Sequence, residues 1–185
     1  MEQALEALRK ALDLAHRRRR CAKHSLHYPL YPVPRVAVLG LELEGPAGVH
    51  CLVDWTPEKL ARLRPQALAG WWNDLEEVAR RLIGGRLELP DLQFPILVFT
   101  HVRSGPLPRR SHELLWEWFQ SPTLEQIRGS GGELLAYECA ARNGFHLAPG
   151  ADPSDLPLVR SAEPCRCGNP APLYRAGTAV SATAR

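Results

Sequence analysis

The stretch RVAVLGLELEGPAGVHCLVDW, residues 35–55, carries the clearest strand pattern in the chain. In its first half apolar residues occupy alternate positions 37, 39, 41 and 43, as in a strand with one buried face. The turn-forming residues GPAG follow, and the alternation resumes over residues 49–55. Two alternating runs joined by a short turn predict a β-hairpin over residues 35–55.

Helices and one further strand are predicted after this hairpin. Thr56 followed by Pro57 is a helix start, and apolar spacing predicts a second helix from about residue 66 to the glycines at 84 and 85. The near-continuous apolar run over residues 94–103 indicates a central strand covered on both faces. Capping-box patterns at residues 123 and 130 predict a helix that continues to about Arg142.

Taken in order, these elements indicate an α+β fold. We expect a small, mainly antiparallel sheet, made of the hairpin 35–55 and the strand 94–103, with helices packed on it. Residues 1–148 form a single domain in this interpretation and begin with a basic helix. Residues 149–185 contain six prolines by residue 172 and little periodicity, which predicts a wrapped loop and a frayed tail.

The chain start and the cysteines indicate a reducing compartment. Acidic residues come early and basic residues late in the first 20 positions, the reverse of a signal peptide, and no run of about 18 apolar residues occurs. Cysteines stand at 21, 51, 139, 165 and 167, an odd number without the spacing of a disulfide framework. We therefore expect a cytoplasmic protein with no membrane span.

Basic residues are concentrated near the N-terminus. Residues 1–35 hold eight Arg and Lys against three acids, and Arg17–Arg20 occupy the last turn of a helix predicted over residues 2–20. Such a concentration favours a polyanion partner, because cations bound to phosphates release counterions. The candidate nucleic-acid-binding residues are Arg17, Arg18, Arg19, Arg20, Lys23, Arg109 and Arg110. The alternative is a solvated helix end enriched in arginine by the codon use of a GC-rich bacterial genome.

Two cysteines one residue apart, Cys165 and Cys167, have the residue type and turn context of half a zinc site. No Cys or His follows them, so completing ligands must lie upstream or on another chain. Cys139 and His146 are the nearest upstream candidates and are joined to the pair by an eighteen-residue loop, 147–164. The sequence thus suggests Zn²⁺ held by Cys139, His146, Cys165 and Cys167. The alternative is two exposed thiols on a loop, with Cys139 buried in a helix.

The same cysteine pair resembles a known zinc motif. Pro164 and the CRCG that follows it resemble the opening of the SEC-C motif, which continues to a tyrosine and a terminal Cys-Cys or Cys-His pair. Tyr174 and Arg175 match the later part of that pattern, whereas Ala176 and Gly177 stand near the places of the final ligands. The resemblance therefore covers only the first ligand pair.

Carboxylates offer a second hypothesis, a metal-dependent nuclease. Glu42, Glu44 and Asp54 would converge across the predicted hairpin, as carboxylates must to hold Mg²⁺ at a scissile phosphate. A helix followed by a hairpin resembles the start of the restriction-endonuclease-like core. The Glu-x-Lys of that family is absent, because Glu42-Leu43-Glu44 supplies no lysine.

A third hypothesis is a protein-interaction subunit or a homo-oligomer. The segment HELLWEWFQ, residues 112–120, is predicted to be a helix that is apolar nearly all round, as in a buried or interface helix. The leading hypothesis remains a non-enzymatic, cytoplasmic nucleic-acid-associated accessory protein. In that hypothesis the N-terminal arginines meet phosphate, and a structural zinc ion is bound near the C-terminus.

Overall fold

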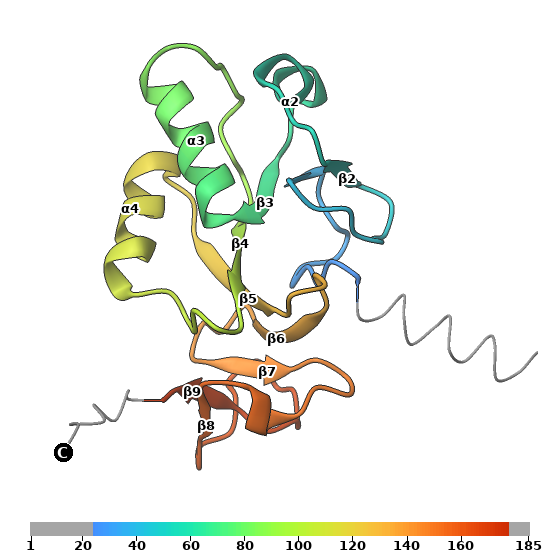
Figure 1. Cartoon of the computed structure of the whole chain (residues 1–185), viewed down its shortest axis with the longest axis vertical. Coiled ribbons are helices and arrows are strands. Elements are labelled where there is room, and N and C mark those ends of the chain that lie inside the picture. Colours follow the sequence, from blue (N-terminus) through green and yellow to red (C-terminus); the bar gives the residue numbers. More distant parts are fainter. Residues whose placement is uncertain (1–23, 178–185) are drawn as a thin grey trace, which may run out of the picture.

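Residues 24–177, described by a computed structural model, form one sheet of nine strands in the order β2-β1-β3-β4-β5-β6-β7-β9-β8 (Figure 1). The strands are β1 (Val36–Leu39), β2 (Val49–Leu52), β3 (Ala67–Trp71), β4 (Ile96–His101), β5 (Thr123–Arg128), β6 (Leu134–Glu138), β7 (Phe145–Leu147), β8 (Leu158–Arg160) and β9 (Tyr174–Ala176). The helices of this part are α2 (Pro57–Leu63), α3 (Trp72–Ile83) and α4 (Arg109–Phe119), with a short 3₁₀ turn η1 (Pro153–Asp155). The predicted helix 2–20, with Arg17–Arg20 and Lys23, lies outside the described residues.

The predicted small antiparallel sheet is wrong, because the sheet is large and mixed. Strands β2, β1, β3, β4 and β5 are parallel to one another, and β6, β7, β9 and β8 continue the sheet antiparallel from β5. The hairpin 35–55 is also wrong: β1 and β2 pair in parallel, with Val36 opposite Val49. The apolar alternation at 37, 39, 41 and 43 does not correspond to one strand. Strand β1 ends before Gly40, which has a φ of 69°, and Leu41 and Leu43 continue the apolar pattern outside the sheet.

The direction of each crossover explains which face each connection covers. Strand β2 lies on one side of β1, and β3, β4 and β5 follow one another on its other side. The connection from β1 to β2 therefore crosses the sheet in the opposite direction to the connections β2–β3, β3–β4 and β4–β5. Right-handed crossovers therefore place the β1–β2 connection, residues 40–48, on one face and the three helices on the other. Leu60, Leu75 and Leu115 of the helices accordingly share one apolar cluster, while Leu41 and Leu43 pack in the cluster on the opposite face. Figure 1 shows α3 and α4 next to one another beside β3, β4 and β5.

Burial in the sheet overrides two helix signals. The helix predicted from residue 66 begins only at Trp72, because residues 67–70, with small side chains at three of four positions, are fully buried as strand β3. The helix predicted from residue 130 to Arg142 is wrong, and the capping-box pattern at 123 belongs to β5, in which every residue is buried. Backbone pairing of β5 with β4 and β6 outweighs the local helix propensity of these residues.

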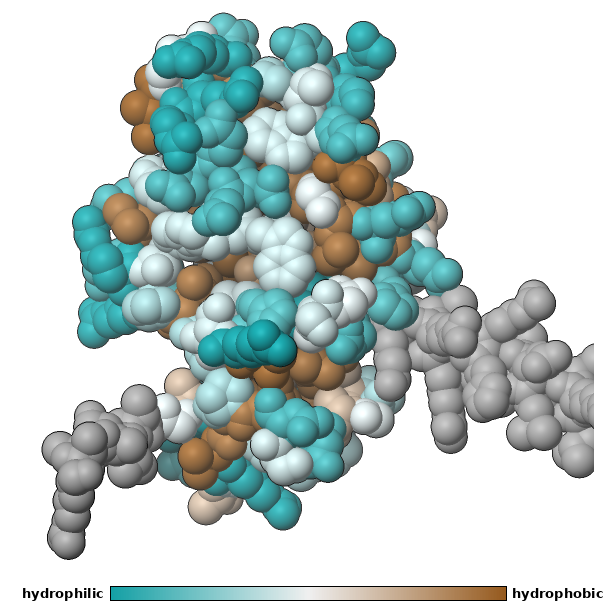
Figure 2. Space-filling view, viewed as in Figure 1, coloured by the Kyte–Doolittle hydropathy of each residue, from teal (hydrophilic) through white to brown (hydrophobic). Residues whose placement is uncertain are grey.

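Other local predictions are confirmed. Thr56 caps α2 with Pro57 at the first helical position, and Gly84 caps the C-terminus of α3. Strand β4 lies centrally between β3 and β5 with almost all of its residues buried. Hydrophilic side chains gather over the outer sides of α3 and α4 (Figure 2), where Arg81 pairs with Glu77 at 2.6 Å. Among the described residues, no helix is long and apolar enough to cross a membrane.

A fully buried arginine ties the N-terminal end of the described chain to the sheet. The Arg128 guanidinium donates to the carbonyls of Gly132 and Ser25 at 2.8 and 3.1 Å, and to Gln126 Oε1 at 2.6 Å. It also lies 4.5 Å from the centroid of the Phe99 ring. Burial lowers the pKa of Arg128 to about 10, so the group remains cationic at neutral pH.

Candidate metal centre

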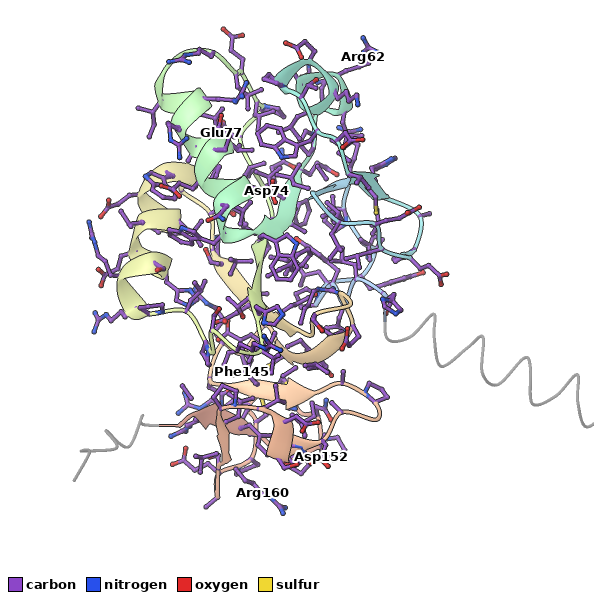
Figure 3. The ribbon with its side chains drawn as sticks, in the orientation of Figure 1. Arg62, Asp74, Glu77, Phe145, Asp152 and Arg160 are labelled. Atoms are coloured by element: carbon purple, nitrogen blue, oxygen red, sulfur yellow. The ribbon has the colours of Figure 1, made fainter. Side chains whose placement is uncertain are left out.

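The antiparallel strands bring four potential metal ligands together. Cys139 follows the last residue of β6, and His146 is the middle residue of β7, opposite Tyr137 of β6. Cys165 and Cys167 lie in the turn between β8 and β9. Because β9 pairs with β7 through Tyr174 and Phe145, this turn is held beside the end of β6. Phe145 is labelled in Figure 3, where β7 meets the C-terminal strands.

The distances fit a tetrahedral ion. The ligand atoms of Cys139, His146, Cys165 and Cys167 all lie within 4.8 Å of one another. The Cys139 and Cys165 sulfurs are 3.4 Å apart, and the Cys167 sulfur is 3.4 Å from His146 Nε2. Tetrahedral zinc with ordinary bond lengths separates two sulfurs by about 3.8 Å, and a sulfur from a nitrogen by about 3.5 Å. The four side chains therefore have the donor set and the spacing that a structural zinc ion requires.

Backbone groups support the sulfurs. The N–H of Cys167 points to the Cys165 sulfur at 3.5 Å, and the N–H of Asn169 points to the Cys167 sulfur at 3.4 Å. Gly168, with a φ of 81°, allows the chain to turn tightly between these donors. N–H groups directed at sulfur stabilise thiolates, the form that binds metal.

The electrostatics of the centre differ from ligand to ligand. Burial and the neighbouring Cys165 thiol raise the pKa of Cys139 to about 12. Burial opposes ionisation of Cys167, but the Asn169 N–H and the two other thiols outweigh it and lower the pKa of Cys167. Burial also lowers the pKa of His146, which keeps the imidazole neutral, although the Pro172 carbonyl acts in the opposite direction. His146 presents Nε2 to the sulfurs, 3.4 Å from that of Cys167.

The centre contains the four side chains grouped from the sequence, all from one chain. Pooling of cysteine pairs from two chains is therefore unnecessary, and Cys139 lies after a strand rather than in a helix. Within residues 24–177 this is the only group of three or more His, Cys, Asp or Glu side chains close enough to share a metal ion.

The carboxylates proposed for a nuclease lie elsewhere. Glu42 and Glu44 are exposed on the connection 40–48, and Asp54 is exposed after the end of β2. They do not form a metal-binding group in the described structure.

The candidate basic and interface residues on α4 are engaged locally. Arg109 and Arg110, exposed in the first turn of α4, lie 3.1 Å from Glu113 and Glu117, respectively. The helix is buried on one side only: Leu115 is fully buried, whereas Trp116 is 50% exposed.

One polar cluster was not anticipated from the sequence. Glu125 is buried within β5 and accepts hydrogen bonds from Thr100 Oγ1 at 2.6 Å and from the Leu107 N–H at 3.0 Å. Its backbone N–H donates to the Glu138 side chain at 2.9 Å, and His112 Nε2 lies 3.8 Å from its second oxygen. Burial raises the pKa of Glu125 to about 7. Glu125 lies inside the TLEQ pattern, which predicts a capping box at a helix start rather than a buried strand, so no sequence signal indicated burial.

No protein-family model matches this sequence, and no curated protein matches it either.

Proposed function

We propose that Cys139, His146, Cys165 and Cys167 bind one zinc ion with a structural role. The proposal is carried by the convergence of three sulfurs and one imidazole nitrogen within 4.8 Å. Four protein ligands complete a tetrahedron and leave no position for a substrate or a reactive water, which distinguishes structural from catalytic zinc.

The packing around the four side chains favours an ion there. The apolar cluster next to them has three buried members, Cys139, Cys165 and Leu173, and two of these are proposed metal ligands. A neighbouring cluster takes Leu156 and the partly buried Leu158 from the same segment. Strands β8 and β9 have three residues each and are largely exposed. A metal ion bound here would add folding free energy to a segment, residues 148–173, that buries few apolar side chains.

Native mass spectrometry of the purified chain tests this proposal. We expect one zinc ion per chain, lost on treatment with a chelator together with a fall in melting temperature. Cys165→Ser should abolish zinc binding, whereas Cys51→Ser, at a thiol outside the centre, should leave it intact. A wild-type chain that neither retains zinc nor gains thermal stability when zinc is added would refute the proposal.

We further propose that the protein is a cytoplasmic accessory protein that associates with nucleic acid through Arg17–Arg20 and Lys23. The supporting observation is the charge distribution, eight Arg and Lys against three acids in residues 1–35 and fifteen against seventeen in the remainder. Phosphate contacts made by such a segment depend on salt, with a slope of about −0.7 per neutralised phosphate for single strands.

A salt titration of binding to a labelled oligonucleotide tests this second proposal. Replacing all four arginines by alanine should weaken binding and make the slope of log K against log salt shallower by about 3. The matched variant with four lysines keeps the charge and should retain the slope. Equal slopes for the wild type and the alanine variant would exclude this segment as the binding site.

A further inference from the structure

A cavity of about 500 Å³ opens beside the metal centre. One wall is the segment that contains His27 and Pro29, and the other is the turn that carries Arg166, Cys167 and Asn169. The metal-ligating turn and the start of the described chain, far apart in sequence, thus enclose one space.

Aromatic rings line this cavity in a column that reaches the metal centre. The centroids of the His27 and Tyr137 rings are 3.7 Å apart, with 37° between their planes. Tyr137 lies in turn 5.8 Å from the ring of the metal ligand His146. The backbone of His27 is fixed because its carbonyl accepts a hydrogen bond from the Gln126 amide. The cavity therefore has a positioned aromatic wall.

The polar groups of the cavity come from the turn between the cysteines and just after it. Arg166, between the two cysteine ligands, is exposed and has no ion-pair or hydrogen-bond partner among residues 24–177. Asn169 uses its side-chain oxygen to accept the Ala171 N–H at 2.9 Å, which leaves its amide nitrogen without a partner in the described chain. A bound metal would order both residues, because Arg166 lies between two proposed ligands and the Asn169 N–H points to the sulfur of Cys167.

The charges favour a neutral ring in the cavity and an anion at its rim. Zinc with three thiolates and a neutral imidazole carries one net negative charge, so an anion is disfavoured next to the ion. Arg166 supplies a cation on one side.

We propose that this cavity binds one unpaired base of a single-stranded nucleic acid, stacked on the His27–Tyr137 wall and flanked by a phosphate at Arg166. The Asn169 amide donates a hydrogen bond to the base edge. Aromatic stacking on an unpaired base is the common mode of single-strand recognition, and a duplex conceals the faces that stacking needs. The inference rests on the nucleic-acid association proposed above and assigns the class of substrate.

Fluorescence anisotropy with a labelled single strand and the corresponding duplex tests this inference. We expect the single strand to bind more tightly and His27→Ala to weaken its binding roughly ten-fold, because one stacking contact is lost. Arg166→Ala should weaken binding several-fold and reduce the salt slope by about 0.7. Arg160→Ala removes the same charge at a residue outside the cavity, labelled in Figure 3, and should have little effect.

A strand without bases tests the stacking contact from the side of the nucleic acid. The wild type should lose affinity for a strand in which every base is removed, and His27→Ala should then cause no further loss. Zinc content measured for each variant shows that the centre is intact.

The outcomes separate the two proposals. Two results would overturn the cavity assignment and leave nucleic-acid association standing. The first is equal affinity for the single strand and the duplex. The second is unchanged affinity in His27→Ala and Arg166→Ala together with lost affinity in the variant lacking Arg17–Arg20. Failure of the wild type to bind any oligonucleotide overturns both.

Discussion

Replacement of Glu125 by glutamine should change how the stability of the protein depends on pH. The Glu125 carboxyl is 1% exposed, and burial raises its pKa from an ordinary value of 4.5 to about 7. The charged form is disfavoured by desolvation first, and the nearby Glu138 carboxylate adds to the effect. His112, whose own pKa is lowered mainly by burial, is the other titratable group that faces it.

The sign and size of the effect follow from proton linkage. Below pH 4.5 both the folded and the unfolded chain keep the Glu125 proton, and the stabilisation that comes from the raised pKa of Glu125 is fully present in the free energy of unfolding. Between pH 4.5 and about 7 the unfolded chain releases the proton while the folded chain retains it, so stability falls as pH rises. A pKa difference of this size corresponds to roughly 3 kcal/mol across the window.

Urea denaturation from about pH 5 to about pH 8 measures this difference. Glutamine does not titrate and can still accept the Leu107 N–H. The free energy of unfolding of Glu125→Gln relative to that of the wild type should therefore increase by roughly 3 kcal/mol as the pH rises through this range. Glu42→Gln, at an exposed carboxyl, should run parallel to the wild type. If the plot of unfolding free energy against pH for Glu125→Gln is also parallel to that of the wild type, Glu125 is ionised in the folded protein and the reasoning is wrong.

Three further substitutions test how the chain is held together. Gly144→Ala puts a Cβ against the Tyr174 carbonyl at a φ of 144°, so we expect separation of β7 from β9 and loss of zinc in native mass spectrometry; retained zinc would contradict this. Arg128→Met removes the donor to two buried acceptors, the Gly132 carbonyl and Gln126 Oε1, and should cost roughly 3 kcal/mol in urea denaturation. It also removes the tie to the Ser25 carbonyl, so hydrogen exchange in residues 24–28 should become faster. Unchanged stability would show that the Arg128 cation makes no net contribution to the free energy of unfolding. Leu115→Ala should cost about 3 kcal/mol and Trp116→Ala less than about 1, and equal losses in thermal unfolding would contradict burial of α4 on one side only.

Local signals in the sequence predicted the elements whose ends are set by local chemistry. Thr56-Pro57 begins α2 because a hydroxyl cap and a proline act within one turn. The apolar run 94–103 predicted a central strand, because burial on both faces requires such a run. Strand direction could not be predicted, since alternation over residues 35–55 is the same for parallel and antiparallel pairs.

The four candidate metal ligands could be grouped from the sequence for a chemical reason. Cysteine and histidine are few in this chain, so four of them within residues 139–167 were easily grouped. The acidic cluster around Glu125 was not predictable, because the same residues serve as helix caps in other contexts and only the sheet buries them. The cavity wall made by His27 and Tyr137 joins segments far apart in sequence, which no local pattern can reveal.

Because β6 lies between the two parts of the sheet, an ion bound at the candidate metal centre would have a protective role. β6 covers the side of β5 that β4 leaves free, and Cys139 follows β6 directly. If metal loss loosened the strands from β6 onward, β5 would present unpaired N–H and C=O groups along an edge that is otherwise buried, and such edges recruit other chains. Zinc starvation would then appear as aggregation rather than as a simple loss of ligand binding.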